Sequence, residues 1–426
     1  MNTWVIVVVL VLLALLGAPL FSIIGGIALY AFDQEGIDTS SVIIELYRIA
    51  ETPTLIAIPL FTFAGYLLAE SRSPQRLVTL ARALFGWIPG GLAIVVLVTC
   101  AFFTAFTGAS GVTIVALGGI TLPILMKEMY PERFSLGLVT ASGSIGLLFP
   151  PSLPIILYGI IAEVSIDQLF VAGFLPGILL VSFVGLYSMR VGVRARVPRV
   201  SFSWPNLAAA LRGAVWELPI PFIIIGGIYG GAFTATEASA VTAFYVLIMV
   251  TFLYRDMTLF RDVPRVMKES MVLVGAILAI LGTALGLTNY LIDKEIPQQL
   301  FEFVQGNVES KVAFLLILNL FLLVVGMMMD IFSAIIVVVP LILPIARAFQ
   351  VDPLHLGIIF LTNLEIGYLT PPVGLNLFLS SLRFKKSILE VARSVLIFIA
   401  IMAAALLIIT YVPDLSLWLV NLLGIQ

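Results

Sequence analysis

The sequence predicts an all-α polytopic membrane protein that contains two inverted repeats. Of its 426 residues, 61% are hydrophobic and 11% are charged, whereas a soluble domain carries about 25% charged residues. Apolar runs of about 20 residues, enough to cross a bilayer, follow one another along the chain. A double proline near a glycine occurs twice, at Pro150-Pro151 and at Pro371-Pro372. Paired interruptions of apolar helices in two repeats indicate a substrate site in a membrane transporter.

The two repeats are separated by a constant offset in the numbering. Subtracting the position of Gly146 from that of Gly367 (367 − 146) gives the same result as subtracting Pro150 from Pro371 (371 − 150), namely 221. Each repeat is therefore predicted to contain one apolar helix that a proline pair interrupts, and the two interruptions occupy equivalent positions.

The N-terminal residues are predicted to remain in the membrane. The segment from Trp4 to Tyr30 has no basic leading region and no small-residue cleavage site, and its apolar run is too long for a signal peptide. We expect a retained first span there and a short interfacial helix at Ser40–Ala50. The single cysteine, Cys100, excludes a disulfide framework and a multi-cysteine metal site.

Loop charges orient the spans, because lysine and arginine concentrate in cytoplasmic loops. The basic loops assigned to the cytoplasm are residues 72–82, 190–212 and 383–393, and the acidic loops assigned to the outside are residues 33–45 and 293–311. With these assignments, Gly91–Met126 starts and ends in the cytoplasm, and its counterpart Val312–Arg347 starts and ends outside. The repeats are therefore expected to be inverted.

Both of these segments are predicted to be re-entrant hairpins, because each is interrupted at its centre, by Thr107–Thr113 and by Gly326–Asp330. Four crossings between Gly159 and Val312 keep the topology consistent. The predicted parts are N-terminal scaffold helices (1–90), the first hairpin and broken helix (91–159), scaffold and connecting helices (160–311), the second hairpin and broken helix (312–382), and a C-terminal scaffold helix and tail (383–426).

The broken helices should expose backbone oxygens. Proline has no N–H, so the carbonyl four residues earlier in a helix loses its partner. The proline pairs should free the carbonyls of Gly146, Leu147, Gly367 and Tyr368. In lipid such groups are costly, so they must contact protein, water or an ion. Carbonyls and hydroxyls suit a hard cation; the alternative is that each pair only kinks a helix for packing.

The hairpin tips and two acidic residues extend this hypothesis. A half-helix that begins at a tip points its positive end inward, which favours an anionic group near Thr107–Thr113. Asp330 and Glu365 lie in apolar stretches, where acidic residues indicate a cation site or a proton relay; an interfacial charge that reaches water is the alternative. His355, the only histidine, is predicted to lie in a solvated external loop.

At these motifs the chain resembles the large membrane subunit of tripartite ATP-independent periplasmic transporters. The resemblance covers nearly the whole chain and rests on Thr107–Thr113, on Gly146–Pro154 with Tyr158-Gly159, and on Glu365–Asn376. It implies a secondary transporter rather than an enzyme, in a bacterial inner membrane. It also implies an elevator mechanism, in which hairpins and broken helices slide together against a scaffold.

The resemblance further implies the ligands and the partners. Two or more sodium ions would drive uptake of a small organic anion, such as a C4-dicarboxylate, a sialic or other sugar acid, or a 2-oxo acid. No organic cofactor and no nucleic acid are implied. The partners would be a small four-helix membrane subunit, encoded as a separate chain, and a periplasmic substrate-binding protein.

Carried over by position, the resemblance assigns residues to two kinds of site. The substrate-binding residues would be Gly108, Ser110, Gly111, Thr113, Ser152 and Asn376. The sodium-binding residues would be Ser110, Ser142, Ser144, Gly146, Pro150, Gly326, Asp330, Asn363, Glu365, Gly367, Thr370, Pro371 and Gly374.

Two other functions are compatible with the sequence. Gly108-Ala-Ser-Gly111 matches the Gly-x-Ser-Gly motif of rhomboid-type intramembrane proteases, in which Ser110 would be the nucleophile and would need a base within hydrogen-bond reach. His355 is the only candidate base. The second alternative is a proton-coupled carrier or a channel that needs no binding protein. The chain has no phosphate-binding loop of the Gly-x4-Gly-Lys-Ser/Thr form.

Overall fold

The computed structural model describes residues 9–10, 12–13, 16, 18–197, 201–308 and 310–424. All regular secondary structure in these residues is helical. Eight of the described helices are long and apolar enough to cross a membrane, and the bent pair Glu132–Leu148 and Leu153–Ala162 supplies a ninth if it counts as one span. The predicted all-α polytopic fold is confirmed.

Two sets of helices repeat one order along the chain, a hairpin followed by a broken helix. The first set is α6 (Gly91–Thr107), α7 (Ser110–Lys127), α8 (Glu132–Ile145), η2 (Gly146–Leu148) and α9 (Leu153–Ala162), and the second is α18 (Lys311–Met328), α19 (Ile331–Ala348), α20 (Pro353–Gly367) and α21 (Leu375–Phe384). The offset found in the sequence relates helices α7 and α19 at both their starts (331 − 110) and their ends (348 − 127). Both predicted interruptions are confirmed.

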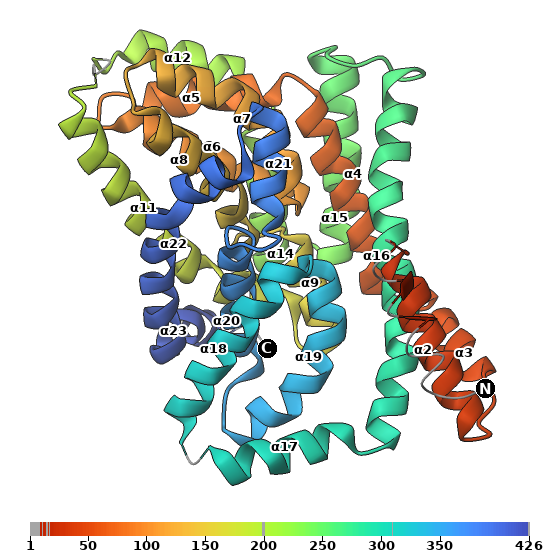
Figure 1. The fold of residues 1–426 in the computed structure, drawn as a ribbon. Helices are drawn as coiled ribbons and strands as arrows, with labels where there is room; N and C mark the ends of the chain where they lie inside the picture. Colours follow the sequence, from red (N-terminus) through yellow and green to blue (C-terminus); the bar gives the residue numbers. More distant parts are fainter. Residues whose placement is uncertain are drawn as a thin grey trace.

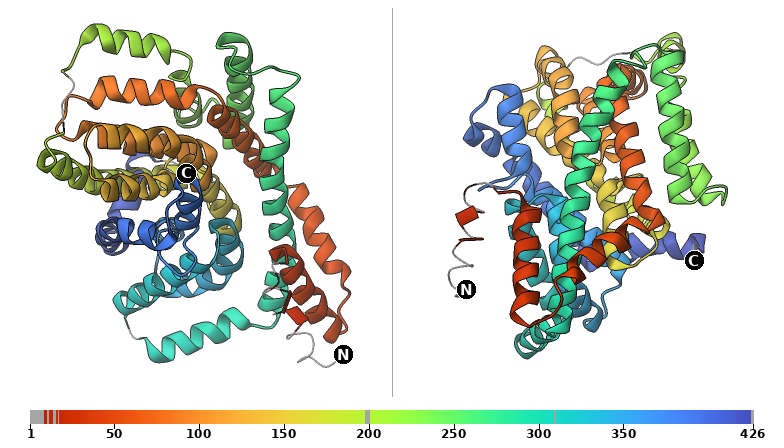
Figure 2. Two further views of the ribbon diagram at one scale, coloured as in Figure 1. Left: turned by 45° about the horizontal axis from the view of Figure 1, so that its top comes forward. Right: turned by 90° about the vertical axis from the view of Figure 1, so that its right-hand side faces the viewer.

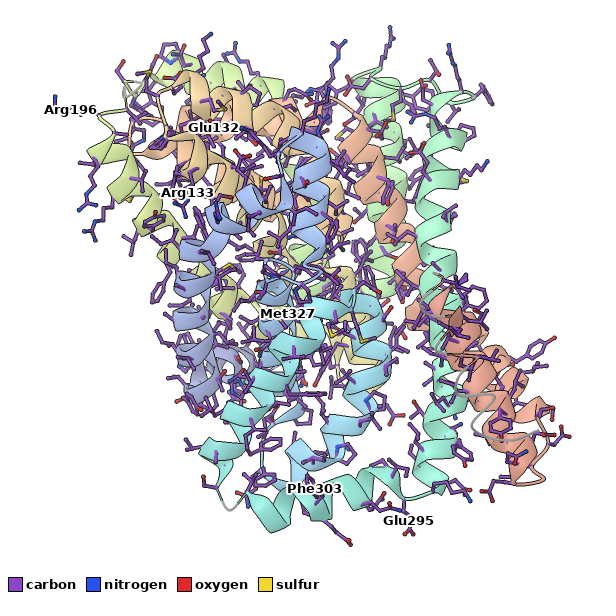
Figure 3. All side chains as sticks on the ribbon, in the orientation of Figure 1. Glu132, Arg133, Arg196, Glu295, Phe303 and Met327 are labelled. Atoms are coloured by element: carbon purple, nitrogen blue, oxygen red, sulfur yellow. The ribbon has the colours of Figure 1, made fainter. Side chains whose placement is uncertain are left out.

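The two hairpins enter the molecule from opposite ends. Figure 1 shows α7 in the upper half and α18 and α19 in the lower half. In Figure 3, Met327 at the second tip lies near mid-height, with Glu132 and Arg196 above it and Glu295 and Phe303 below it. The repeats are therefore inverted, as the loop charges predict.

The repeats pack across one another at the centre. Helix α7 packs against α21 of the second repeat, and α19 packs against α9 of the first. The Ser144 hydroxyl lies 3.5 Å from the Glu365 carbonyl oxygen and donates to it. Because these two residues are related by the repeat offset (365 − 144), the pseudo-two-fold axis passes between them.

The other spans fall into two packing groups. Helices α11 (Phe174–Arg194) and α22 (Ile388–Tyr411) pack against each other and against the hairpin-containing sets, together with α10 (Ile166–Ala172) and α23 (Asp414–Leu423). The second group comprises α2 (Leu20–Gln34), α3 (Ser40–Ala50), η1 (Pro53–Ile56), α4 (Ala57–Glu70), α13 (Pro219–Pro221), η3 (Phe222–Gly226), α14 (Gly227–Tyr229), α15 (Ala235–Ile248), η4 (Met249–Leu253) and α16 (Asp262–Asp293). Helix α11 packs against α6 of the first hairpin, and α22 packs against the broken-helix segments α8, α20 and α21.

Of the four predicted crossings between Gly159 and Val312, three match helices long enough to cross a membrane, namely α10 with α11, α15 with η4, and α16. The segment from α13 to α14 (Pro219–Tyr229) is a shorter apolar helix. The short helix predicted at Ser40–Ala50 is confirmed with those bounds. The predicted span Trp4–Tyr30 lies partly outside the described residues. Within them, helix α2 begins at Leu20, directly after Pro19 at its N-cap.

Helices α5 (Ser73–Phe85) and α12 (Trp204–Gly213) lie across one end of the molecule, and α17 (Ile296–Asn307) lies across the other (Figures 1 and 2). A buried charge cluster joins α5 to two loops. Arg76 contacts Glu217 at 3.2 Å and Asp256 at 2.8 Å. The hydroxyls of Ser73 and Tyr254 donate to the Glu217 carboxylate at 3.0 and 2.6 Å.

Because the Glu217 side chain is only 1% exposed, its removal would leave Arg76 and two hydroxyls without their shared acceptor. We expect Glu217→Ala to lower the free energy of unfolding by about 3 kcal/mol. The measurement is thermal or denaturant unfolding of the purified protein in detergent. The control is Glu390→Ala, because Glu390 is 49% exposed in its pair with Lys386 and should contribute less than about 1 kcal/mol. Equal losses in the two variants would contradict the assignment.

Candidate functional site

A cavity of about 310 Å³ lies between the two hairpin tips. The first tip contributes Gly108–Val112, and the second contributes Asp330–Phe332. Tyr368 and Leu375 border it from the second break, and Tyr66 of α4 and residues 273–280 of α16 close the opposite side. The cavity therefore lies where the hairpin-containing group meets the group built around α4 and α16.

The first tip presents a helix N-terminus without a side-chain cap. Ala109 is the N-cap residue of α7, and its methyl group cannot accept a hydrogen bond. The first backbone bonds to Ala109 start at Val112 and Thr113, so the N–H groups of Ser110 and Gly111 precede them. These N–H groups and the positive end of the helix dipole favour an anion in the cavity.

Asn376, which follows the second break, contacts the first tip. The Ser110 hydroxyl donates to Asn376 Oδ1 at 2.7 Å, and both side chains are buried. The Nδ2 group of Asn376 is buried and has no partner among the described residues. An unpaired buried donor beside an uncapped helix end indicates a second hydrogen bond available to an anionic ligand.

The second tip differs, because Asp330 caps α19. Its Oδ1 accepts from the N–H groups of Phe332 and Ser333, both at 3.0 Å, and its Oδ2 accepts from the Ser333 hydroxyl. The Ile331 N–H donates to the Tyr368 hydroxyl. The Asp330 carboxylate, predicted as a sodium ligand, therefore already satisfies and neutralises the end of α19.

The prediction of freed carbonyls is wrong for three of the four groups. The Gly146 and Gly367 carbonyls accept from the N–H groups of Phe149 and Thr370, and the Tyr368 carbonyl accepts from Asn376. The chain tightens into a 3₁₀ turn or bends back, so a residue other than the proline supplies the donor. Each oxygen still has a second lone pair available to a ligand.

Both proline pairs are cis, and each break is covered by its own hairpin. A side chain at Gly146 would collide with the Ala101 carbonyl of α6, and one at Gly367 would collide with the backbone of Gly326. The Gly374 N–H donates to the Met327 carbonyl at 3.1 Å. Gly326 and Gly374 thus lie in the close contact between the second hairpin and its break, and Pro150 and Pro371 begin the two proline pairs.

Several predicted hydroxyls already have partners. Those of Ser142 and Ser144 donate to carbonyls within α8, and that of Thr370, in the turn after α20, donates to the Ile366 carbonyl. The Thr113 hydroxyl lies 2.8 Å from Thr104 Oγ1, which is also 2.8 Å from the Gly143 carbonyl oxygen, so Thr113 links α7 to α6 and does not border the cavity.

Three predicted residues at the breaks carry buried oxygens without a partner among the described residues. They are Glu365 with both carboxylate oxygens, Asn363 with Oδ1, and Ser152 with Oγ. All three residues are fully buried. A bare carboxylate in such surroundings is too costly to persist as an anion. Glu365 must therefore hold a cation or a proton.

No group of three or more His, Cys, Asp or Glu side chains that could hold a metal ion occurs among the described residues. Any cation at the breaks would therefore have to be bound chiefly by carbonyl, hydroxyl and amide oxygens. Such ligands suit a hard monovalent or divalent cation rather than zinc.

The prediction for His355 is wrong. This residue is buried in α20, with Nδ1 at 3.2 Å from Ser416 Oγ and Nε2 at 3.2 Å from the Thr410 carbonyl oxygen. Asp352 caps the helix here, which folds the predicted loop into its first turn. Because Ser110 pairs with Asn376 instead, the serine–histidine dyad of a rhomboid-type protease does not form.

Sequence reasoning missed the side chains of Asn319, Tyr66 and Tyr368. Asn319 Oδ1 accepts from Asn363 Nδ2 at 2.7 Å, and Asn319 Nδ2 donates to Thr410 Oγ1 at 3.1 Å. An amide in an apolar run is a signal of the kind used for Glu365 and could have found Asn319. Tyr66 and Tyr368 have no such signal, because only the packing brings them to the cavity.

Inverted hairpins, paired broken helices and a central cavity between helix ends define a secondary transporter. Residues 5–415 match the family described as tripartite ATP-independent periplasmic transporter, DctM component. The chain belongs to this family and is a large permease of such a transporter.

Known relatives align with most of this chain in sequence. The C4-dicarboxylate TRAP transporter large permease protein DctM of Pseudomonas aeruginosa is 38% identical over 94% of each chain. The isethionate TRAP transporter permease protein DctMQ of Oleidesulfovibrio alaskensis is 38% identical over 85% of this chain and 58% of that relative. The YdaH transporter of Alcanivorax borkumensis has the same fold, with a TM-score of 0.63, 13% identity and coverage of 90% and 88%.

The capping role of Asp330 leads to a stability prediction. Asp330→Ala removes three hydrogen bonds at the start of α19 and should lower the free energy of unfolding by about 1–2 kcal/mol. Asp330→Asn keeps an acceptor at the N-cap and should retain most of the stability. Unfolding in detergent measures both variants. A loss in Asp330→Asn as large as in Asp330→Ala would show that the charge, rather than the cap, is what matters.

Proposed function

We propose that this chain is the large subunit of a sodium-coupled, binding-protein-dependent importer of a small organic anion. The observation that carries the proposal is the cavity between the tips, in which the α7 end at Ala109 is uncapped and the α19 end is neutralised by Asp330. One positive helix end is thus left for a carboxylate or sulfonate group. The relatives' names, C4-dicarboxylate and isethionate, fit this chemistry.

The proposed partners are a small four-helix membrane subunit and a periplasmic binding protein. The family description, tripartite and periplasmic, supports this composition. The inner membrane of a bacterium is the proposed location, since a periplasmic component faces that membrane from the outside. The binding protein would deliver the anion to the side on which α18 and α19 enter.

Sodium coupling is supported by the buried oxygens at the breaks. The second site would lie at Glu365, whose two carboxylate oxygens have no partner among the described residues, in the last turn of α20 beside the break. Asn363 Oδ1 also lacks a partner, but it lies two residues away on α20 and therefore on another face of the helix. The first would lie around Ser152 and Gly146, close to the first hairpin. A monovalent cation neutralises Glu365 without requiring a dedicated cluster of acidic ligands.

An elevator motion is supported by the position of the cavity between two packing groups. Gly65 of α4 lies so close to the first tip that a side chain there would meet the backbone of Phe106 and Thr107. The hairpins, broken helices, α11 and α22 would move as one body against the group containing α4 and α16. The anion would then be carried past Tyr66.

The first test concerns the cation. Glu365→Gln keeps the volume of the side chain and removes its charge, so the half-saturating sodium concentration for uptake into proteoliposomes should rise about tenfold. Glu302→Gln is the matched control, because Glu302 is exposed on α17. Uptake must be measured with the small subunit and the binding protein present.

The outcomes distinguish the coupling ions. A raised sodium requirement in Glu365→Gln alone supports the proposal. An unchanged sodium dependence would show that Glu365 is not a ligand. Uptake driven by a proton gradient without sodium, and abolished by a protonophore, would establish the proton-coupled alternative instead.

The second test concerns the anion. Ala109→Asp copies into α7 the cap that Asp330 gives α19, and it adds a negative charge at the proposed anion site. Uptake should fall about tenfold or more. Ala109→Asn can make the same cap without the charge and should retain more activity. Equal uptake by the two variants would contradict anion binding at this helix end.

A further inference from the structure

A second cavity, of about 650 Å³, lies between α5 and α12 and shares no lining residue with the cavity at the hairpin tips. We refer to it as the arginine cleft. Its lining includes Arg72, Arg76 and Arg82 of the α5 region, Trp87, and Ser203 and Asn206 at the start of α12. No acidic residue is among its described lining residues.

The arginines differ in how far they are neutralised. Arg76 is paired with the buried Glu217 and Asp256 behind the cleft, and Arg82 pairs with Glu128 at 2.9 Å. Arg72 donates its backbone N–H to Asp256 at 3.2 Å. Among the described residues, no carboxylate lies within ion-pair distance of the Arg72 guanidinium, so the cleft keeps an uncompensated positive charge.

The start of α12 adds donors to the cleft. Ser203 is the N-cap residue of this ten-residue helix and makes no capping hydrogen bond with its side chain. The Ser203 hydroxyl and the Asn206 amide both border the cleft. A free hydroxyl, an amide and the positive end of a helix beside arginine form suitable surroundings for a phosphate group.

Aromatic side chains lie at the edge of the same cleft. Trp87 and Phe202 are 50% and 42% exposed and contact each other edge to face, as do Phe202 and Trp204. Tryptophan side chains are enriched at the membrane–water interface, at the depth of the lipid headgroups. Figure 2 shows α5 and α12 lying across this end of the molecule, and the basic loops assign the end to the cytoplasm, where anionic lipids are concentrated.

From this arrangement we propose that the arginine cleft binds a phosphate group, supplied either by an anionic phospholipid headgroup or by free phosphate. Arg72 would pair with the phosphate, and Ser203 and Asn206 would donate hydrogen bonds to it. The bound group would join α5 to α12 and hold the two surface helices together. The proposal is independent of the transport site, since no residue is shared between the two cavities.

The experiment measures retention of dioleoylphosphatidylglycerol by the purified full chain, using native mass spectrometry, with dioleoylphosphatidylcholine as the zwitterionic reference. Arg72→Gln should weaken phosphatidylglycerol retention about fivefold. Arg212→Gln is the matched control, because Arg212 is exposed on α12 and does not line the cleft. Arg72→Lys should restore part of the retention, and thermal unfolding of each variant confirms that it is folded.

A second arm adds inorganic phosphate in place of lipid. Stabilisation of the wild-type chain by inorganic phosphate, lost in Arg72→Gln, would identify free phosphate as the source. Preference for phosphatidylglycerol, lost in Arg72→Gln and kept in Arg212→Gln, would identify the headgroup. The proposal is overturned if Arg72→Gln behaves as Arg212→Gln does with both ligands.

Discussion

Backbone polar groups in a bilayer must find partners, because lipid offers none. Two helices of this protein are broken, and a hairpin of the same repeat packs closely on each break. Gly146 lies against the carbonyl of Ala101, and Gly367 lies against Gly326. Local turns within the breaks satisfy three of the four carbonyls that the prolines release. The cavity, the two tips and their inverted arrangement all follow from this constraint.

The backbone is nearly symmetric, whereas the side chains at equivalent positions are not. Ala109 corresponds to Asp330, and Ser144 corresponds to Glu365, because the repeat offset relates the members of each pair (330 − 109 and 365 − 144). The first tip is left positive, and the second tip is neutral. Of the two breaks, only the second contains an acidic residue, Glu365. This asymmetry separates a region suited to an anion from a region suited to a cation within one symmetric framework.

The sequence predicted the repeats, the hairpins and their inversion well, because a constant offset and loop charges report directly on topology. It also placed Ser110 and Gly111 at the cavity. The predictions were wrong or incomplete where tertiary packing determines which groups contact each other. The carbonyl of Gly367 is satisfied by a turn, His355 is buried by the capping of α20, and Tyr66 approaches the tip from a distant helix. None of these contacts leaves a pattern in the chain.

Direct binding of radioactive sodium to the purified chain tests the central claim, that a cation occupies the buried oxygens around Glu365 at the second break. The account predicts saturable sodium binding without added substrate, not displaced by an equal concentration of potassium. Absence of saturable binding at any sodium concentration that supports uptake would contradict it.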